Sequence, residues 1–192
     1  MSYELIVIGA SWGGLHAVSE ILRHLPAELD AAVVIAQHRR AESDGGLASL
    51  LAHHAALPVQ DADDKQPIEK GHVYLAPPDY HLLVERGHFA LSVDDRVRFA
   101  RPSIDVLFES AADAYGECVV GVILTGANDD GADGLSRVKA LGGVAIVQEP
   151  TSAERHEMPD AALATTVADA VLPLEEIGPF LYGLVVRPGV RQ

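Results

Sequence analysis

The chain has 192 residues, of which 48% are hydrophobic and 22% charged, enough apolar material for the single core of one soluble domain. Twenty-eight acidic residues against 14 basic ones give a net charge of −14, and such a surface repels the phosphates of nucleic acid and anionic lipid. We therefore expect no nucleic-acid partner and no insertion into a membrane, for which the apolar runs are also too short. A single cysteine excludes an internal disulfide and favours a reducing, cytoplasmic location.

Apolar β-branched runs alternate along the chain with stretches of helical period. A strand is predicted at 3–10 and a helix at 13–26, with Leu15, Val18, Ile21, Leu22 and Leu25 on one face. Further strands are predicted at 31–38, 58–62, 71–78, 118–126, 144–150 and the start of 169–185. Further helices are predicted at 45–55, 101–116, 130–143, 158–166 and the rest of 169–185.

Two local features interrupt this rhythm. Residues 80–93 alternate around "RG" and predict an inserted β-hairpin, and Ser103 is the expected N-cap of the helix that follows. The pattern predicts a doubly wound α/β fold: a mostly parallel sheet with helices on both faces and that hairpin. We expect one domain over residues 1–186 and a frayed C-terminal tail at 187–192.

Polar segments follow three of the predicted strands: "GASWGG", "QHRR" and "TGANDDGADG". In a parallel sheet the carboxyl ends of the strands bring their loops to one edge. A hydroxyl, an imidazole and a carboxylate are therefore expected to meet there. Acyl hydrolysis needs these three groups, because a base has to take the proton of the serine and a third group has to orient the base.

Ser11 lies between Gly9 and Gly13, as in the G-x-S-x-G turn that holds a nucleophilic hydroxyl clear of the backbone. The N–H groups of Trp12 and Gly13, at the start of the predicted helix, would face a developing oxyanion. The motif is equally typical of a glycine turn with a capping serine. The hydroxyl is thus a candidate nucleophile only.

His38 is the first choice for the base, because it directly follows a buried strand, and His81 is its main rival for the same reason. The carboxylate has three candidates in one loop, Asp129, Asp130 and Asp133, each of which also suits a turn or a helix N-cap. No histidine or cysteine cluster has zinc spacing, and the loop lacks the ligand pattern of an EF-hand, so we expect no metal.

A dinucleotide-binding Rossmann protein is an alternative, because "GAS" between a strand and a helix also occurs in short-chain dehydrogenases. However, Leu15 stands where the third glycine of that motif belongs. No tyrosine is followed four residues later by lysine, and the net charge of −14 would not attract an anionic cofactor. We therefore expect no cofactor.

The sequence resembles the catalytic domain of the chemotaxis protein-glutamate methylesterases, the CheB-type family, almost from end to end. The resemblance is carried, in order, by "IVIGASWGG", "VVIAQHR", "GHVYLAPPDYHLLV", "RPSIDVLFESAA", "GVILTGANDDGADGL", "GGVAIVQEP" and "MPDAAL". It implies Ser11 as nucleophile, His38 as base and Asp130 as carboxylate, since the family loop reads T-G-x-x-x-D-G-A. It also implies an oxyanion hole made by the backbone N–H groups of Trp12 and Ala127.

The resemblance further implies hydrolysis of glutamyl methyl esters on the cytoplasmic helices of chemoreceptors, through an acyl-enzyme, with deamidation of glutamines as a related reaction. The sequence departs from the family pattern at Trp12, where threonine is common. Many members also carry an N-terminal receiver domain, whereas this chain opens with the first predicted strand. The chain is therefore expected to be either a stand-alone catalytic domain or part of a longer protein, and separate signalling proteins are candidate partners for its regulation. A retargeted esterase and a non-catalytic binding member of the family are the alternatives.

Overall fold

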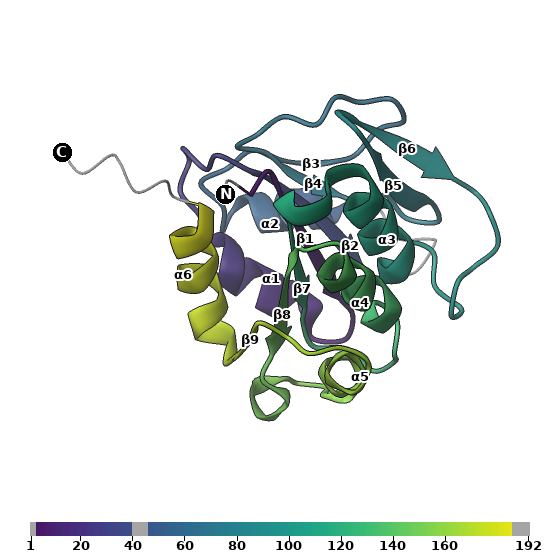
Figure 1. Ribbon diagram of the computed structural model, residues 1–192. Coiled ribbons are helices and arrows are strands. Elements are labelled where there is room, and N and C mark those ends of the chain that lie inside the picture. The colour runs from purple at the N-terminus through teal and green to yellow at the C-terminus, as the bar shows by residue number, and fades with distance from the viewer. Residues whose placement is uncertain (1–2, 40–45, 186–192) are drawn as a thin grey trace.

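The computed structural model describes residues 3–39 and 46–185 (Figure 1). Within them, seven parallel strands form one sheet in the order β3-β4-β2-β1-β7-β8-β9, and β5 and β6 form an antiparallel hairpin. The sheet strands are β1 (Leu5–Ala10), β2 (Ala32–Gln37), β3 (Val59–Asp61), β4 (Val73–Leu75), β7 (Val119–Ile123), β8 (Val144–Gln148) and β9 (Ala170–Leu172). The hairpin strands are β5 (His81–Glu85) and β6 (His88–Ser92). The predicted fold class is confirmed.

Helices cover both faces of the sheet, as Figure 1 shows. One face carries α3 (Ile104–Tyr115), α4 (Ala132–Ala140), α5 (Glu157–Thr165) and the hairpin. The other face carries α1 (Gly14–Leu22), α2 (Gly46–Ala52) and α6 (Leu174–Val185). Two short 3₁₀ turns, η1 (Gly116–Cys118) and η2 (Pro150–Ser152), complete the described elements.

Side chains that alternate along each strand divide the core into two layers. In β1, Leu5 and Val7 pack with α3 and α4, whereas Ile6 and Ile8 pack with α1 and α6. All four are fully buried, which is why the central strands read as continuous apolar runs in the sequence. At about 25 cal/mol per Å² of buried apolar surface, these two layers supply the main driving force for folding.

Local signals place most element boundaries correctly. Ser103 caps α3 as predicted, its hydroxyl accepting a hydrogen bond from the N–H of Val106. Leu15, predicted on the same helix face as Val18 and Ile21, is not buried with them: the residue is 44% exposed. Leu15 belongs to the first turn of α1, just beyond the carboxyl end of β1.

The predicted tail at 187–192 lies outside the described residues, as does residue 186. In the described part of the chain, none of the helices combines the length and the apolar character needed to cross a bilayer.

Candidate active site

The order of the strands reverses beside β1, and this brings three loops together. After β1 the chain first builds β2, β3 and β4 on one side, then returns through α3 to place β7 on the other side. Gly9, near the end of β1, consequently pairs with Ala36 of β2 and Ile123 of β7. Such a reversal opens a crevice at the carboxyl edge of a parallel sheet. The loops that carry Ser11, His38 and Asp130 all begin there.

The structure brings these three side chains into one hydrogen-bonded series. Ser11 Oγ lies 3.2 Å from His38 Nδ1, and His38 Nε2 lies 2.7 Å from Asp130 Oδ2. The imidazole is 14% exposed and the carboxylate is fully buried. The order hydroxyl, imidazole, carboxylate is that of a serine hydrolase triad, with the two ring nitrogens interchanged relative to the chymotrypsin pattern.

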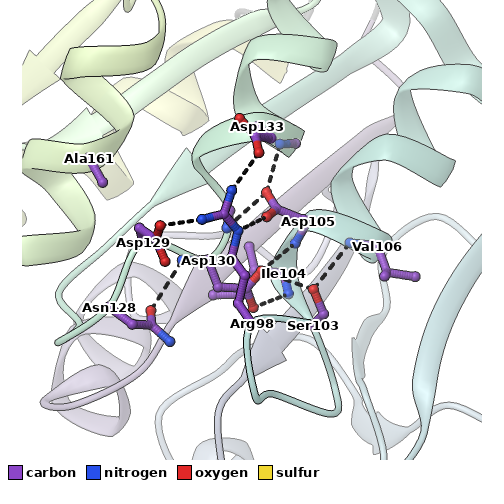
Figure 2. A network of polar contacts seen from close by, with 12 residues as sticks. Arg98, Ser103, Ile104, Asp105, Val106, Asn128, Asp129, Asp130, Asp133 and Ala161 are labelled. Atoms are coloured by element: carbon purple, nitrogen blue, oxygen red, sulfur yellow. Dashed lines mark hydrogen bonds and ion pairs between the residues drawn. The ribbon is translucent and has the colours of Figure 1, made fainter. Parts of the chain in front are cut away.

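Asp130 binds the N-terminus of α3 (Figure 2). It accepts hydrogen bonds from Ser103 Oγ at 2.9 Å and from the N–H groups of Ile104 at 2.7 Å and Asp105 at 3.0 Å. Burial alone would raise the pKa of Asp130, but the bonds from His38 and from these N–H groups outweigh it and lower that pKa. The carboxylate is therefore ionised at neutral pH and accepts hydrogen bonds only.

The charge on Asp130 fixes the proton on the imidazole. An ionised carboxylate cannot donate, so His38 Nε2 must carry the hydrogen of the 2.7 Å contact. In the neutral ring this leaves a lone pair on Nδ1, directed at the hydroxyl of Ser11. The arrangement can therefore remove a proton from Ser11.

The turn that carries Ser11 is held by contacts from both neighbouring strands. Gly13 has a φ of +78°, which glycine adopts without strain and which turns the chain into α1. The amide Nε2 of Gln37 donates to the carbonyls of Ser11 at 2.8 Å and His38 at 3.1 Å. The N–H of Ser11 donates to the carbonyl of Thr125. These hydrogen bonds tie Ser11, His38 and the loop after β7 together through their backbone atoms.

Trp12 and Ala127 lie on the two sides of Ser11. Gly126 passes so close to Ser11 that a Cβ added to it would come within 2.9 Å of the Ser11 Cβ, which brings the following residue, Ala127, to the same edge. The Trp12 side chain is 64% exposed, and its indole N–H donates to Glu154. Across the described residues, the backbone N–H groups of Trp12 and Ala127 have no acceptor.

A second carboxylate, Asp105, binds the N-terminus of the neighbouring helix α4. Its Oδ1 accepts from the N–H groups of Gly131 at 2.9 Å and Gly134 at 2.7 Å, so α3 and α4 each receive an acid from the other's N-terminal segment. Burial raises the pKa of Asp105 to about 6. The negative charge of Asp130 also raises this pKa, whereas the N–H of Gly134 and the guanidinium of Arg98 lower it. The contacts of Asp130 with the N-terminus of α3 and of Asp105 with the N-terminus of α4 together fix the loop that contains Asp130.

The other residues considered from the sequence do not join the series. His81 is buried: its Nδ1 accepts from the N–H of Ser103, and its Nε2 donates to the carbonyl of Asp95. Asp129 and Asp133 are 60% and 58% exposed and form ion pairs with Arg98. None of the three contacts His38.

Sequence reasoning missed three residues that shape the site. Gln37 bridges two backbone carbonyls there, Asn128 Nδ2 lies 3.4 Å from His38 Nδ1, and Arg98 binds three aspartates. Gln37 and Asn128 lie within two of the polar segments that follow the strands, which is the signal that could have marked them; Arg98 lies outside these segments and has no such signal.

A cavity of about 400 Å³ opens next to His38, lined among others by His38, Asn128, Phe99 and four arginines. Among the described residues, no three histidine, cysteine, aspartate or glutamate side chains converge as metal ligands would.

Comparison with known proteins identifies the family of this chain. The sequence profile described as CheB methylesterase matches residues 6–181. The chain belongs to the CheB methylesterase family. It is 48% identical over 178 residues to a putative protein-glutamate methylesterase/protein-glutamine glutaminase of Leptospira interrogans, a match that covers 92% of both chains.

Other members of the CheB methylesterase family agree with this placement. Protein-glutamate methylesterase/protein-glutamine glutaminase 3 of Pseudomonas aeruginosa is 40% identical over 93% of this chain, which spans 53% of that relative. The crystal structure of the Thermotoga maritima CheB methylesterase catalytic domain superimposes with a TM-score of 0.91 at 33% identity. It covers 96% of this chain and 100% of that one, so the doubly wound sheet and the hairpin are the fold of the CheB catalytic domain.

Proposed function

We propose that the chain is a serine hydrolase that removes methyl esters from glutamyl side chains of chemoreceptors. The observation that carries the proposal is the series Ser11–His38–Asp130, with contacts of 3.2 and 2.7 Å. Membership of the CheB methylesterase family and the printed names of its relatives support the choice of ester. The proposed place of action is the cytoplasm, where the methylated receptor helices lie.

The first half of the reaction acylates Ser11. His38 Nδ1 takes the proton of the hydroxyl while Oγ attacks the ester carbonyl, and the cation that forms is stabilised by buried Asp130. The oxygen of the tetrahedral intermediate carries the negative charge. The backbone N–H groups of Trp12 and Ala127, which have no acceptor in the described chain, are proposed to bind it. The imidazolium then returns the proton to the leaving methoxide, and methanol departs.

The second half regenerates the enzyme. His38 removes a proton from water, the resulting hydroxide attacks the acyl-enzyme, and the proton returns to Ser11 Oγ as glutamate is released. A glutamine side chain enters the same sequence with ammonia as the leaving group. No step requires a metal or an organic cofactor.

Two measurements test the proposal. A fluorophosphonate probe is expected to label wild-type protein at Ser11, located by peptide mass spectrometry. Ser11→Ala is expected to lower methanol release from a methylated receptor fragment by about 10³-fold or more. Ser49→Ala, on the exposed surface of α2, serves as the matched control.

The outcomes separate the candidates. Label on another residue, or near-normal turnover by Ser11→Ala, would overturn the triad. Cleavage of p-nitrophenyl acetate with no action on the receptor would replace receptor demethylation by the retargeted-esterase alternative, whereas inactivity on both substrates would favour a binding role.

A further inference from the structure

A two-residue turn at the mouth of the cavity has an unusual backbone. Val97 and Ala100 exchange two backbone hydrogen bonds, of 3.1 and 2.8 Å, and enclose Arg98 and Phe99. Both enclosed residues are left-handed, with φ values of +49° and +64°. A turn of this kind normally has asparagine and glycine at these positions, because a bulky side chain strains the left-handed backbone. Such strain persists only where surrounding contacts hold it.

Arg98 supplies the contacts that hold the turn (Figure 2). Its guanidinium forms ion pairs with Asp105, at 3.0 Å, and with Asp129 and Asp133. These aspartates lie at the N-terminal ends of α3 and α4, where Asp130 is also held. The turn is thereby fixed to the same framework as the proposed catalytic carboxylate.

The consequence is that Phe99 is presented to solvent. Its side chain is 95% exposed, although an aromatic ring of this size is stabilised by burial. It lines the cavity that contains His38. An exposed aromatic residue on a rigid turn loses little conformational entropy when a partner covers it, which is typical of interface hot spots.

The cavity is also rich in cations, although the chain as a whole is strongly acidic. Four of the 14 lysines and arginines line it, in a protein of net charge −14. The guanidinium of Arg101 donates hydrogen bonds to Asp79 and to backbone carbonyls, and that of Arg98 forms ion pairs with three aspartates. Arg96 is different, because its side chain is 54% exposed and, among the described residues, its only polar contact is with Asp79 at 3.4 Å. Its guanidinium is available to a carboxylate.

Arg39 adds donors deeper in the cavity. Its side chain is only 8% exposed, and Nη2 donates to Asp61 and to the carbonyl of Ala76. Within the described residues, its Nε and Nη1 are buried without an acceptor. A buried donor without a partner is costly, so these two N–H groups leave Arg39 with unused hydrogen-bonding capacity beside the cavity.

We propose that Phe99 and Arg96 form a docking site for the polypeptide that carries the ester, Phe99 packing on an apolar side chain and Arg96 binding an acidic one. The proposal rests on the proposed function, because it takes the ester to be part of a polypeptide. A small ester needs only to reach Ser11, whereas the residues on either side of an esterified glutamate must lie against the rim. The occupant is therefore a segment with apolar and acidic side chains next to the modified residue.

The test compares two substrates, a methylated receptor fragment and p-nitrophenyl acetate. Phe99→Ala is expected to raise KM for the receptor about tenfold, the usual effect of truncating a hot spot, with little change in kcat. The kcat/KM for the receptor therefore falls about tenfold relative to that for the small ester. Arg96→Gln is expected to raise the receptor KM about threefold at low salt and less at high salt, since an exposed ion pair is screened.

Matched controls lie away from the cavity. Phe180→Ala alters a partly exposed phenylalanine on α6, and Arg86→Gln alters an arginine that contacts Glu4 at the opposite edge of the sheet. Both are expected to keep the wild-type ratio between the two substrates. Phe99→Gly separates binding from backbone strain, because glycine relaxes the turn and removes the ring; it is expected to lose receptor affinity as Phe99→Ala does.

Three results would overturn the proposal in different ways. Wild-type KM for the receptor in Phe99→Ala and Arg96→Gln, with normal turnover by wild-type protein, would refute the docking site alone. Wild-type KM in Phe99→Gly would show that Phe99 acts only through the backbone. If wild-type protein released no methanol from the receptor, the proposed function would fail and the docking site with it.

Discussion

The two ends of the series Ser11–His38–Asp130 lie in opposite environments. The Asp130 carboxylate is completely buried and accepts four hydrogen bonds, three of them from the first residues of α3 and its cap. Ser11 is partly exposed, and its hydroxyl contacts only the imidazole among the described residues. The many hydrogen bonds of Asp130 hold the acid end rigidly, whereas the partly exposed hydroxyl end is open to a substrate, and His38 lies between them.

Each end depends on different forces. Burial strengthens the hydrogen bonds of Asp130 because water does not compete for its oxygens. The hydroxyl end has to remain open, since a substrate carbonyl must come within bonding distance of Oγ. Mutations at the acid end should therefore affect both stability and activity, and mutations at the hydroxyl end mainly activity.

The largest effect is expected for Asp130→Asn. The amide would donate to His38 Nε2, so the ring proton would move to Nδ1, and the base could no longer accept from Ser11; kcat for p-nitrophenyl acetate is expected to fall about 10⁴-fold. Unfolding free energy is expected to fall by about 2 kcal/mol, because an ionised acceptor of the α3 N-terminus is lost. Ser11→Ala should match the loss of kcat but change stability by less than about 0.5 kcal/mol.

Asp129→Asn is the control for this prediction, because Asp129 is the neighbouring residue and is 60% exposed. It is expected to keep kcat within about threefold and to change stability only slightly, as exposed ion pairs do. Steady-state kinetics and urea denaturation measure both quantities. Equal losses of stability in Asp130→Asn and Ser11→Ala would contradict the difference between the two ends.

An intermediate effect, dependent on pH, is expected at Asp105. Its pKa is raised from an ordinary 3.8 to about 6 by burial, so between these pH values the folded protein holds a proton that the unfolded chain has released. Stability from this group therefore falls as the pH rises from about 4 to about 6. Asp105→Asn removes the dependence, and its unfolding free energy relative to wild type is expected to increase over that window.

Urea denaturation of both proteins at pH 4, 5, 6 and 7 measures this difference. Glu109→Gln, another α3 acid whose pKa burial raises, shows how much a less buried carboxyl changes the slope. A difference between Asp105→Asn and wild type that is constant with pH would show that Asp105 does not titrate there.

The smallest effect is expected at the hydroxyl end, for Trp12→Ala. The indole is 64% exposed and its one hydrogen bond, to Glu154, is on the surface, so stability should change by less than about 0.5 kcal/mol. The backbone N–H next to Ser11 is retained, and kcat for p-nitrophenyl acetate is expected to stay within about threefold. Thermal unfolding and ester hydrolysis test this. A hundredfold loss of kcat would show that the indole itself takes part in the reaction.

The fold class, the hairpin and the cap of α3 could all be predicted from the sequence. These depend on local rules: buried parallel strands need apolar side chains on both faces, and a serine at an N-cap satisfies a free N–H group. The sequence also predicted that three polar loops meet at one edge, because the carboxyl ends of parallel strands point the same way. From the residues alone, however, Asp129, Asp130 and Asp133 were equivalent candidates, and only the family resemblance favoured Asp130.

Contacts between segments distant in sequence distinguish the three aspartates. Asp130 is the aspartate whose side chain reaches the N-terminus of α3, more than 20 residues earlier, while the other two turn outward to Arg98. His81 follows a strand as His38 does, yet its ring is occupied by Ser103 and Asp95. The sequence has no glycine or asparagine at Arg98 and Phe99 to indicate a left-handed turn. The turn forms nevertheless, because the ion pairs of Arg98 to aspartates at two helix ends hold it. Local propensity cannot report such contacts, since their energy exists only once the chain has folded.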